Sequence, residues 1–135
     1  MKSTILSLFI IILLVSGCTT NDKSDNHGVD RERSVKHVSV YLSSTEPTAI
    51  ISDEQQVRSF LSIIEQAKPL PEGLAYTDDF FRTFTIDYTD GSTRTLSFNK
   101  GGGKVFSDSL DGKDYGIDEA DKQQLQALVR EAETK

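Results

Sequence analysis

The chain has 135 residues, a formal net charge of −6 at pH 7, 36% hydrophobic residues and a single cysteine. The acidic balance argues against binding to nucleic acid or to anionic lipid surfaces, because both attract basic patches. A single cysteine excludes a disulfide within the chain.

Residues 1–17 are typical of a secretory signal peptide. Lys2 supplies a positive charge, and Ile5 to Val15 form an eleven-residue run that is apolar except for Ser7. A membrane-spanning helix needs about 20 apolar residues, whereas this shorter run fits the hydrophobic region of a signal peptide.

The residues before the cysteine form the pattern Leu14-Val15-Ser16-Gly17-Cys18. This pattern resembles the lipobox of bacterial lipoproteins, a family in which the cysteine thiol receives a diacylglycerol and becomes the first residue of the mature protein. The resemblance implies lipidation of Cys18, and two acyl chains give stable membrane anchoring. The alternative is an ordinary signal peptide, or an uncleaved anchor, with an accidental cysteine.

Residues 18–34 are expected to hold the lipidated Cys18 and a disordered tether. Val29 is the only apolar side chain in 19–34, so this segment buries too little surface to offset the entropy lost on ordering. A flexible segment of this length spans roughly 20–24 Å. Its four acidic and three basic residues do not form a polybasic membrane-binding tail.

Residues 35–135 are expected to form a single α+β domain with 17 acidic and 11 basic residues. Its first strand is predicted where Val38, Val40 and Leu42 alternate with Ser39 and Tyr41. A short apolar run at 49–51, after a proline, indicates an edge strand.

Two helices are expected in this domain. The S-x-x-Q pattern that begins at Ser52 predicts a capping box, and the prolines at 69 and 71 end this first helix. The second helix is predicted to begin near Asp118, whose neighbouring acids favour the positive end of the helix dipole. The apolar stripes of the two helices are Val57, Phe60, Leu61, Ile64 and Ala67, and then Leu125, Leu128, Val129 and Ala132.

Residues 82–98 predict a β-hairpin, and the parity of its apolar residues predicts the turn. Directly paired residues lie on the same face of a sheet, so Phe84 should pair with Leu96. A three-residue loop at 89–91 gives this register, with Gly91 in the left-handed conformation of a G1-bulge turn.

After three glycines, Val105 and Phe106 predict another strand, and 114–116 a short one. Strands in runs, two helices and the absence of an alternating βαβ pattern indicate an α+β fold. We expect an antiparallel sheet of four to six strands with both helices on one face, because the other face of each strand is polar.

Two segments are candidate binding sites. In the first, Tyr76, Phe80 and Phe81 include adjacent aromatic residues that cannot both enter the core from a regular strand. Either a bulge admits both, or one is exposed as an interaction surface.

The second candidate is the acidic stretch 108–121, in which Asp108, Asp111 and Asp114 could hold a cation such as Ca²⁺. An EF-hand register fails, because it places serines at the first two ligand positions. The alternative is a solvated loop that leads into a helix.

No cofactor or catalytic constellation is recognised in the sequence. Gly101-Gly102-Gly103-Lys104 precedes a strand rather than a helix, so it does not fit a phosphate-binding loop. The two histidines have no second ligand that supports a metal site, and no G-x-S-x-G motif is present. We therefore expect a protein that is not an enzyme and needs no cofactor.

Residues 35–133 resemble small lipoproteins of bacilli of the YhfM type. The shared features are the V-x-V-Y strand, Ile51 followed by E-x-x-V-x-x-F-L-x-x-I, Ala67-Lys68, the Asp90-Gly91 turn, and a last helix after Tyr115-x-Ile117. The resemblance implies no catalytic residues. It implies the outer face of the cytoplasmic membrane; in a Gram-negative host, Thr19 would suit the outer membrane.

The expected function is a membrane-tethered, extracytoplasmic, non-enzymatic module that binds a protein or an envelope polymer. The partners are then the membrane, through the lipid, and an unknown envelope component, with no nucleic acid. The alternative is a lipoprotein that binds a small ligand or a cation through residues 108–121.

Overall fold

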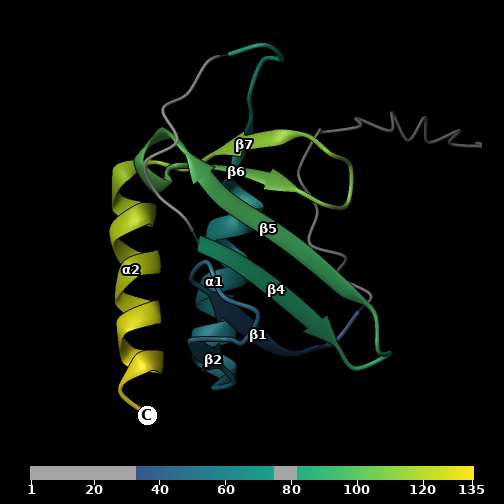
Figure 1. The fold of residues 1–135 in the computed structure, drawn as a ribbon, viewed down its shortest axis with the longest axis vertical. Helices are drawn as coiled ribbons and strands as arrows, with labels where there is room; N and C mark the ends of the chain where they lie inside the picture. The colour runs from purple at the N-terminus through teal and green to yellow at the C-terminus, as the bar shows by residue number, and fades with distance from the viewer. Residues whose placement is uncertain (1–32, 75–81) are drawn as a thin grey trace, which may run out of the picture.

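The structure is a computed structural model that describes residues 33–74 and 82–135. Figure 1 shows its elements, which confirm the predicted α+β class. In chain order they are β1 (Val35–Tyr41), β2 (Ala49–Ile51), α1 (Glu54–Gln66), β3 (Lys68–Pro69), β4 (Arg82–Tyr88), β5 (Thr93–Lys100), the 3-10 turn η1 (Gly101–Gly103), β6 (Val105–Asp108), β7 (Asp114–Gly116) and α2 (Glu119–Glu133).

The strands of the described residues form one antiparallel sheet of seven, in the order β2-β1-β4-β5-β6-β7-β3. The expected count of four to six was too low. One strand that the sequence did not predict is β3, where Lys68 pairs with Gly116 and Pro69 with Tyr115. From the sequence, Pro69 was expected only to end a helix. A proline lacks the backbone N–H but is accepted on a sheet edge, where β3 lies.

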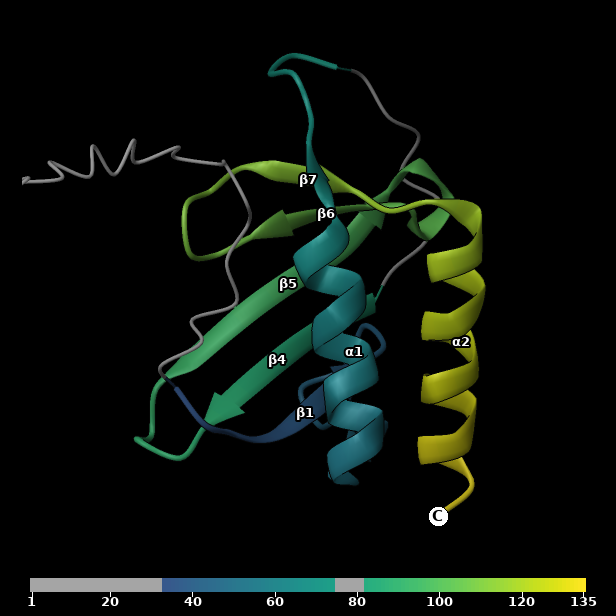
Figure 2. The ribbon, with the colours of Figure 1, turned by 180° about the vertical axis from the view of Figure 1, so that it is seen from behind.

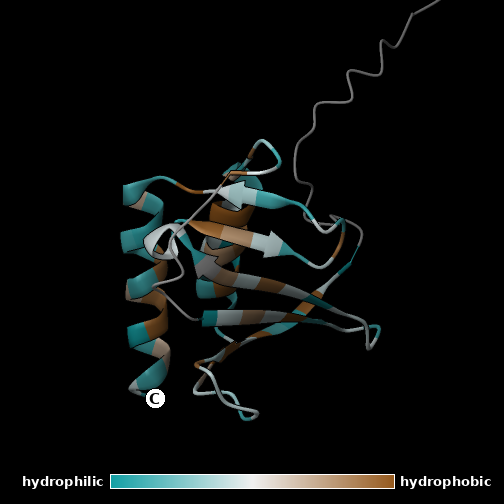
Figure 3. Ribbon diagram, turned by 45° about the horizontal axis from the view of Figure 1, so that its top comes forward, coloured by the Kyte–Doolittle hydropathy of each residue, from teal (hydrophilic) through white to brown (hydrophobic). Residues whose placement is uncertain are grey.

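Both helices cover one face of the sheet, as predicted. One continuous core contains residues from α1, α2 and the facing side of the strands, and Figure 2 shows α1 lying across the sheet with α2 beside it. A chain of aromatic rings crosses this core, with successive centroids 4.8–5.7 Å apart: Phe60, Phe84, Phe98, Phe106 and Tyr115. Apolar and polar residues alternate along the central strands in Figure 3, so the opposite face of the sheet is polar.

The first helix begins one residue later than the capping-box pattern indicated. The N-cap is Asp53 rather than Ser52, and the Asp53 carboxylate accepts hydrogen bonds from the backbone N–H groups of Gln55 and Gln56, both at 3.1 Å. A carboxylate is a strong N-cap acceptor that also favours the positive end of the helix dipole. The predicted apolar stripe is buried apart from the half-buried Leu61, and Ile63 joins it.

The second helix and the hairpin agree with the sequence. Asp118 caps α2 through the backbone N–H of Asp121 at 2.7 Å, and all four predicted stripe residues are buried. In the hairpin, Phe84 pairs with Leu96, and Gly91 has a φ of +85°. The three-residue loop is closed by a hydrogen bond from the Tyr88 N–H to the Ser92 carbonyl, at 3.0 Å.

The first strand ends earlier than the alternation predicted. β1 stops at Tyr41, and Leu42 is 50% exposed rather than part of the core. Ser43 follows with a positive φ of 50°, which turns the chain away from the sheet. The alternating pattern therefore continued one position beyond the strand.

Candidate functional site

The polar face of the sheet carries a dense array of hydroxyl groups. We call this surface the outer face, and no helix of the described residues covers it. It is formed by alternate residues of five strands: His37, Ser39, Tyr41, Thr83, Thr85, Asp87, Thr93, Thr95, Ser97, Ser107 and Asp114. Eight of these eleven residues bear a hydroxyl group.

Strand register arranges these side chains in rows that run across the strands. The longest row takes one residue from each of five neighbouring strands, and we call it the long row: Tyr41, Thr83, Ser97, Ser107 and Asp114. Neighbouring strands lie about 4.8 Å apart, so the long row extends about 19 Å. It forms a row of hydrogen-bonding groups that no single segment of the sequence contains.

A hollow lies at each end of the long row. The Tyr41 hollow, about 460 Å³, is lined by Tyr41, Thr83, Thr85 and residues 43–45. The Asp114 groove, about 490 Å³, is lined by residues 69–73 on one wall and by Lys100, Ser107 and residues 112–114 on the other. The Asp114 groove is the more enclosed of the two, whereas the Tyr41 hollow is shallow and open to solvent.

Asp114 is the most strongly held acidic group on the outer face. Its carboxylate accepts a hydrogen bond from the Ser107 hydroxyl at 2.5 Å and one from the Lys100 ammonium at 2.9 Å. The hydrogen bond from Ser107, followed by that from Lys100, lowers the pKa of Asp114 although partial burial opposes the shift. Asp114 is therefore an ionised acceptor at neutral pH, balanced by one ammonium group.

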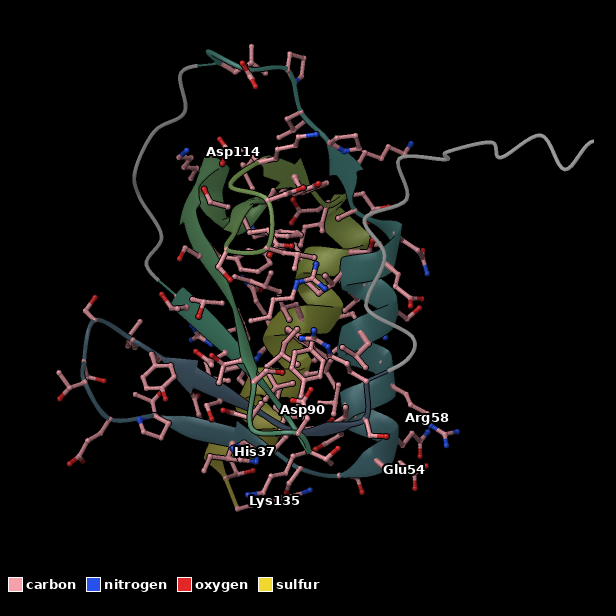
Figure 4. The ribbon with its side chains drawn as sticks, turned by 90° about the vertical axis from the view of Figure 1, so that its right-hand side faces the viewer. His37, Glu54, Arg58, Asp90, Asp114 and Lys135 are labelled. Carbon is pink, nitrogen blue, oxygen red and sulfur yellow. The ribbon has the colours of Figure 1, made fainter. Side chains whose placement is uncertain are left out.

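A second polar cluster lies at the far end of the outer face. His37 Nε2 lies 3.1 Å from Asp87 Oδ2, and the Ser39 hydroxyl donates to the same oxygen at 3.2 Å. Figure 4 shows His37 and Asp114 at opposite ends of the domain. The two clusters are therefore separate sites rather than parts of one catalytic constellation.

Arg94 and Asp108 form an ion pair inside the domain, with side chains 3% and 0% exposed. Arg94 Nε lies 3.1 Å from both carboxylate oxygens, and Nη2 lies 2.5 Å from Oδ2. Burial alone would lower the pKa of Arg94, but the hydrogen bond and charge of Asp108 outweigh it and raise that pKa. This pair was not predicted from the sequence. The sequence did contain a signal for the burial of Arg94: Arg94, Leu96 and Phe98 are alternate residues of one strand, so all three face the core.

The three acidic residues predicted as a cation site do not converge. Asp108 holds Arg94, Asp114 holds Lys100 and Ser107, and Asp111 accepts a hydrogen bond from the Tyr115 hydroxyl at 2.5 Å. No group of three or more His, Cys, Asp or Glu side chains in residues 33–74 and 82–135 is placed to hold a metal ion. Each carboxylate instead has a partner of its own.

The other predicted sites lie outside the described residues. These are Cys18 and the aromatic residues Tyr76, Phe80 and Phe81. Their roles in lipidation and in interaction stay predictions. No helix of the described part of the chain has the length and apolar character needed to span a membrane.

Comparison with known proteins gives no relative: no family model, no curated protein and no solved structure matches this chain. The features that can indicate a function are therefore the outer face, its two hollows and the residues around Cys18.

Proposed function

We propose that the chain is a lipid-anchored, extracytoplasmic, non-enzymatic module whose outer face binds an envelope polysaccharide. The observation that carries this proposal is the long row, a line of four hydroxyls and one carboxylate across five strands with a hollow at each end. It extends the expectation of an interaction module by naming a surface and a chemical class.

The chemistry of the outer face suits a polysaccharide. A hydroxyl group both donates and accepts hydrogen bonds, and a polysaccharide presents the same groups along its length. Neutral hydroxyls also bind without the large desolvation cost that exposed charges would carry. A linear chain that crosses the strands would meet one side chain of the long row at each strand, at intervals of about 4.8 Å.

A protein partner fits this surface less well. The buried centres of protein interfaces are enriched in aromatic residues, Met and Arg, whereas the outer face carries mainly Ser and Thr among its described residues. Its large apolar side chain is Tyr41, which is half-buried, and Ile50 of the neighbouring strand β2, which is 48% exposed, lies beside the outer face. The predicted aromatic surface at Tyr76, Phe80 and Phe81 would be the natural place for a protein partner.

The anchor proposed at Cys18 would hold one end of the domain near the membrane. The described chain begins at Arg33, which contacts the turn between β4 and β5: its guanidinium lies 5.7 Å from the Tyr88 ring centroid, and Nη1 donates to the Ser92 hydroxyl at 3.2 Å. The Ser34 carbonyl accepts the Thr89 N–H at 2.9 Å. The tether thus joins the domain at this turn, while the Asp114 groove lies between β5, β7 and β3.

The compartment follows from the anchor. A lipidated Cys18 would place the domain on the outer side of the cytoplasmic membrane, as the resemblance to YhfM-type lipoproteins implies, or in the outer membrane of a Gram-negative host. Either location would bring the outer face into contact with envelope polymers.

The cation-binding alternative has less support. Asp108 is buried against Arg94, so it could bind a cation only after the loss of that ion pair. Removal of one partner from a buried pair is strongly destabilising, by about 3–5 kcal/mol. Calcium that raises the thermal midpoint of the full chain would restore this alternative.

Co-sedimentation with insoluble cell-wall material tests the proposed function. The purified full chain should pellet with isolated cell-wall polysaccharide, and Thr85→Arg, at the centre of the outer face, should abolish pelleting. Gln124→Arg is the matched control, because it adds the same charge on the exposed side of α2. Equal pelleting of all three proteins would overturn the proposal, as would retention by protein-containing material alone.

A further inference from the structure

We propose that the Asp114 groove is the sugar-selecting site of this module, and that it takes a neutral pyranose ring of the polymer. This inference rests on the proposed function, because it assigns to one end of the long row the recognition of an individual sugar. The groove is built from two walls of different chemistry, contributed by segments that are distant in the sequence.

One wall is polar and offers both kinds of hydrogen-bonding group. Lys100 donates, the Asp114 carboxylate accepts, and the Ser107 hydroxyl can do both. The Lys100 and Asp114 side chains are 31% and 27% exposed. They are therefore partly buried but still reachable from the groove.

The other wall is formed by the chain that follows α1. Pro69, Leu70 and Pro71 lie on it, and β3 attaches it to β7. The Leu70 N–H donates to the Asp114 carbonyl at 3.0 Å, and a Cβ atom placed on Gly116 would lie 3.3 Å from the Leu70 side chain. Leu70 thus packs closely on β7 and holds this wall against the sheet. An apolar wall suits the C–H side of a sugar ring, whose burial is favourable.

The balance of charge around the groove favours a neutral ligand. The charged groups that line it are Lys100 and Lys113, which are positive, and Glu72 and Asp114, which are negative. A phosphate or carboxylate would meet the two acidic groups, and a cation would meet the two lysines. A neutral ring with several hydroxyls can use the Lys100–Asp114 pair as donor and acceptor together without an uncompensated charge.

The experiment is a calorimetric titration of the full chain with a neutral β-1,4-linked probe, tetra-N-acetylchitotetraose. Lys100→Met removes the donor, and Asp114→Asn removes the charged acceptor. Glu72→Arg narrows the groove from an exposed position on the other wall and leaves the Lys100–Asp114 pair in place. The control is Arg58→Met, which breaks the exposed Arg58–Glu54 pair on α1, far from Asp114 in Figure 4.

We expect each groove variant to weaken binding at least tenfold, while Arg58→Met binds like the wild type. Thermal midpoints identify any variant that loses its fold, and Glu72→Arg then carries the test alone. If the groove variants bind the probe normally and Thr85→Arg fails to pellet with cell-wall polysaccharide, the groove assignment is wrong and the proposed function stands. If the probe does not bind but the chain still pellets with cell-wall polysaccharide, the ligand class of the groove is wrong. If neither the probe nor the polysaccharide binds, both proposals fail.

Discussion

Arg94 and Asp108 carry two charges that the fold buries almost completely. The hydrogen bonds between the two groups offset part of the cost of burying the charges, because the guanidinium contacts both carboxylate oxygens. Such a pair contributes little net stability relative to an apolar pair, but one partner without the other is an uncompensated buried charge. The pair therefore specifies how β5 and β6 are joined more than it stabilises the fold.

Arg94→Met should lower the free energy of unfolding by about 3–5 kcal/mol, because Asp108 would be left buried without its cation. Arg94→Met combined with Asp108→Leu should be less destabilised than the single variant. Urea unfolding of the wild type, of Arg94→Met, of Asp108→Leu and of the double variant measures both effects. If the double variant is as unstable as the sum of the two single variants, the two charges do not act as a pair.

The lowered pKa of Asp114 should make the stability of the domain depend on pH. The pKa of Asp114 is lower in the folded chain than its ordinary value of 3.8, so its contribution to stability is complete above that value and is lost as the pH falls through the lowered folded value. The difference in unfolding free energy between wild type and Asp114→Asn should be constant near neutral pH and shrink below pH 3.8. A difference that stays constant in acid would show that Ser107 and Lys100 do not hold the ionised form.

Asp53 and Ser52, two neighbouring residues at the start of α1, should differ in their contribution to stability. Asp53→Ala removes the acceptor of two backbone hydrogen bonds, and this should cost about 1 kcal/mol. Ser52→Ala, one residue earlier, should change the unfolding free energy by less than about 0.5 kcal/mol. Chemical denaturation distinguishes them, and a larger loss for Ser52→Ala would return the cap to the residue that the sequence pattern indicated.

Local patterns predicted the elements whose information is local. The period of α1 and α2, and the parity of Phe84 and Leu96 around Gly91, are set by residues close in sequence, and the structure confirms them. β3 was missed because two residues, Lys68 and Pro69, carry no periodicity, and only pairing with the distant β7 makes them a strand. Pairing between distant segments was the information that the sequence did not supply.

The candidate site was predicted only in part, for the same reason. Alternating threonines and serines in β4 and β5 are visible in the sequence, but the long row also needs the registers of β1, β6 and β7. Asp114 was predicted as a cation ligand, although its neighbours in space are Lys100 and Ser107. Composition identified acidic residues, whereas their partners depended on the fold.

In the whole molecule, the proposed module combines a binding face with a membrane anchor. Cys18→Ala should remove the acyl chains, which together give stable membrane association, so that the protein is released into the medium or left unprocessed. Fractionation of cells, with the mass of the N-terminus measured, tests this. A variant that remains in the membrane and is still cleaved after Gly17 would contradict the lipoprotein assignment.

NMR spectroscopy can locate the bound polysaccharide on the domain. Soluble fragments of cell-wall polysaccharide would be titrated into the isotope-labelled full chain while backbone amide shifts are followed by NMR. We expect the signals that shift to belong to the long row, from Tyr41 across Thr83, Ser97 and Ser107 to Asp114. Shifts confined to α1 and α2, or the absence of any shift at saturating polysaccharide, would contradict it.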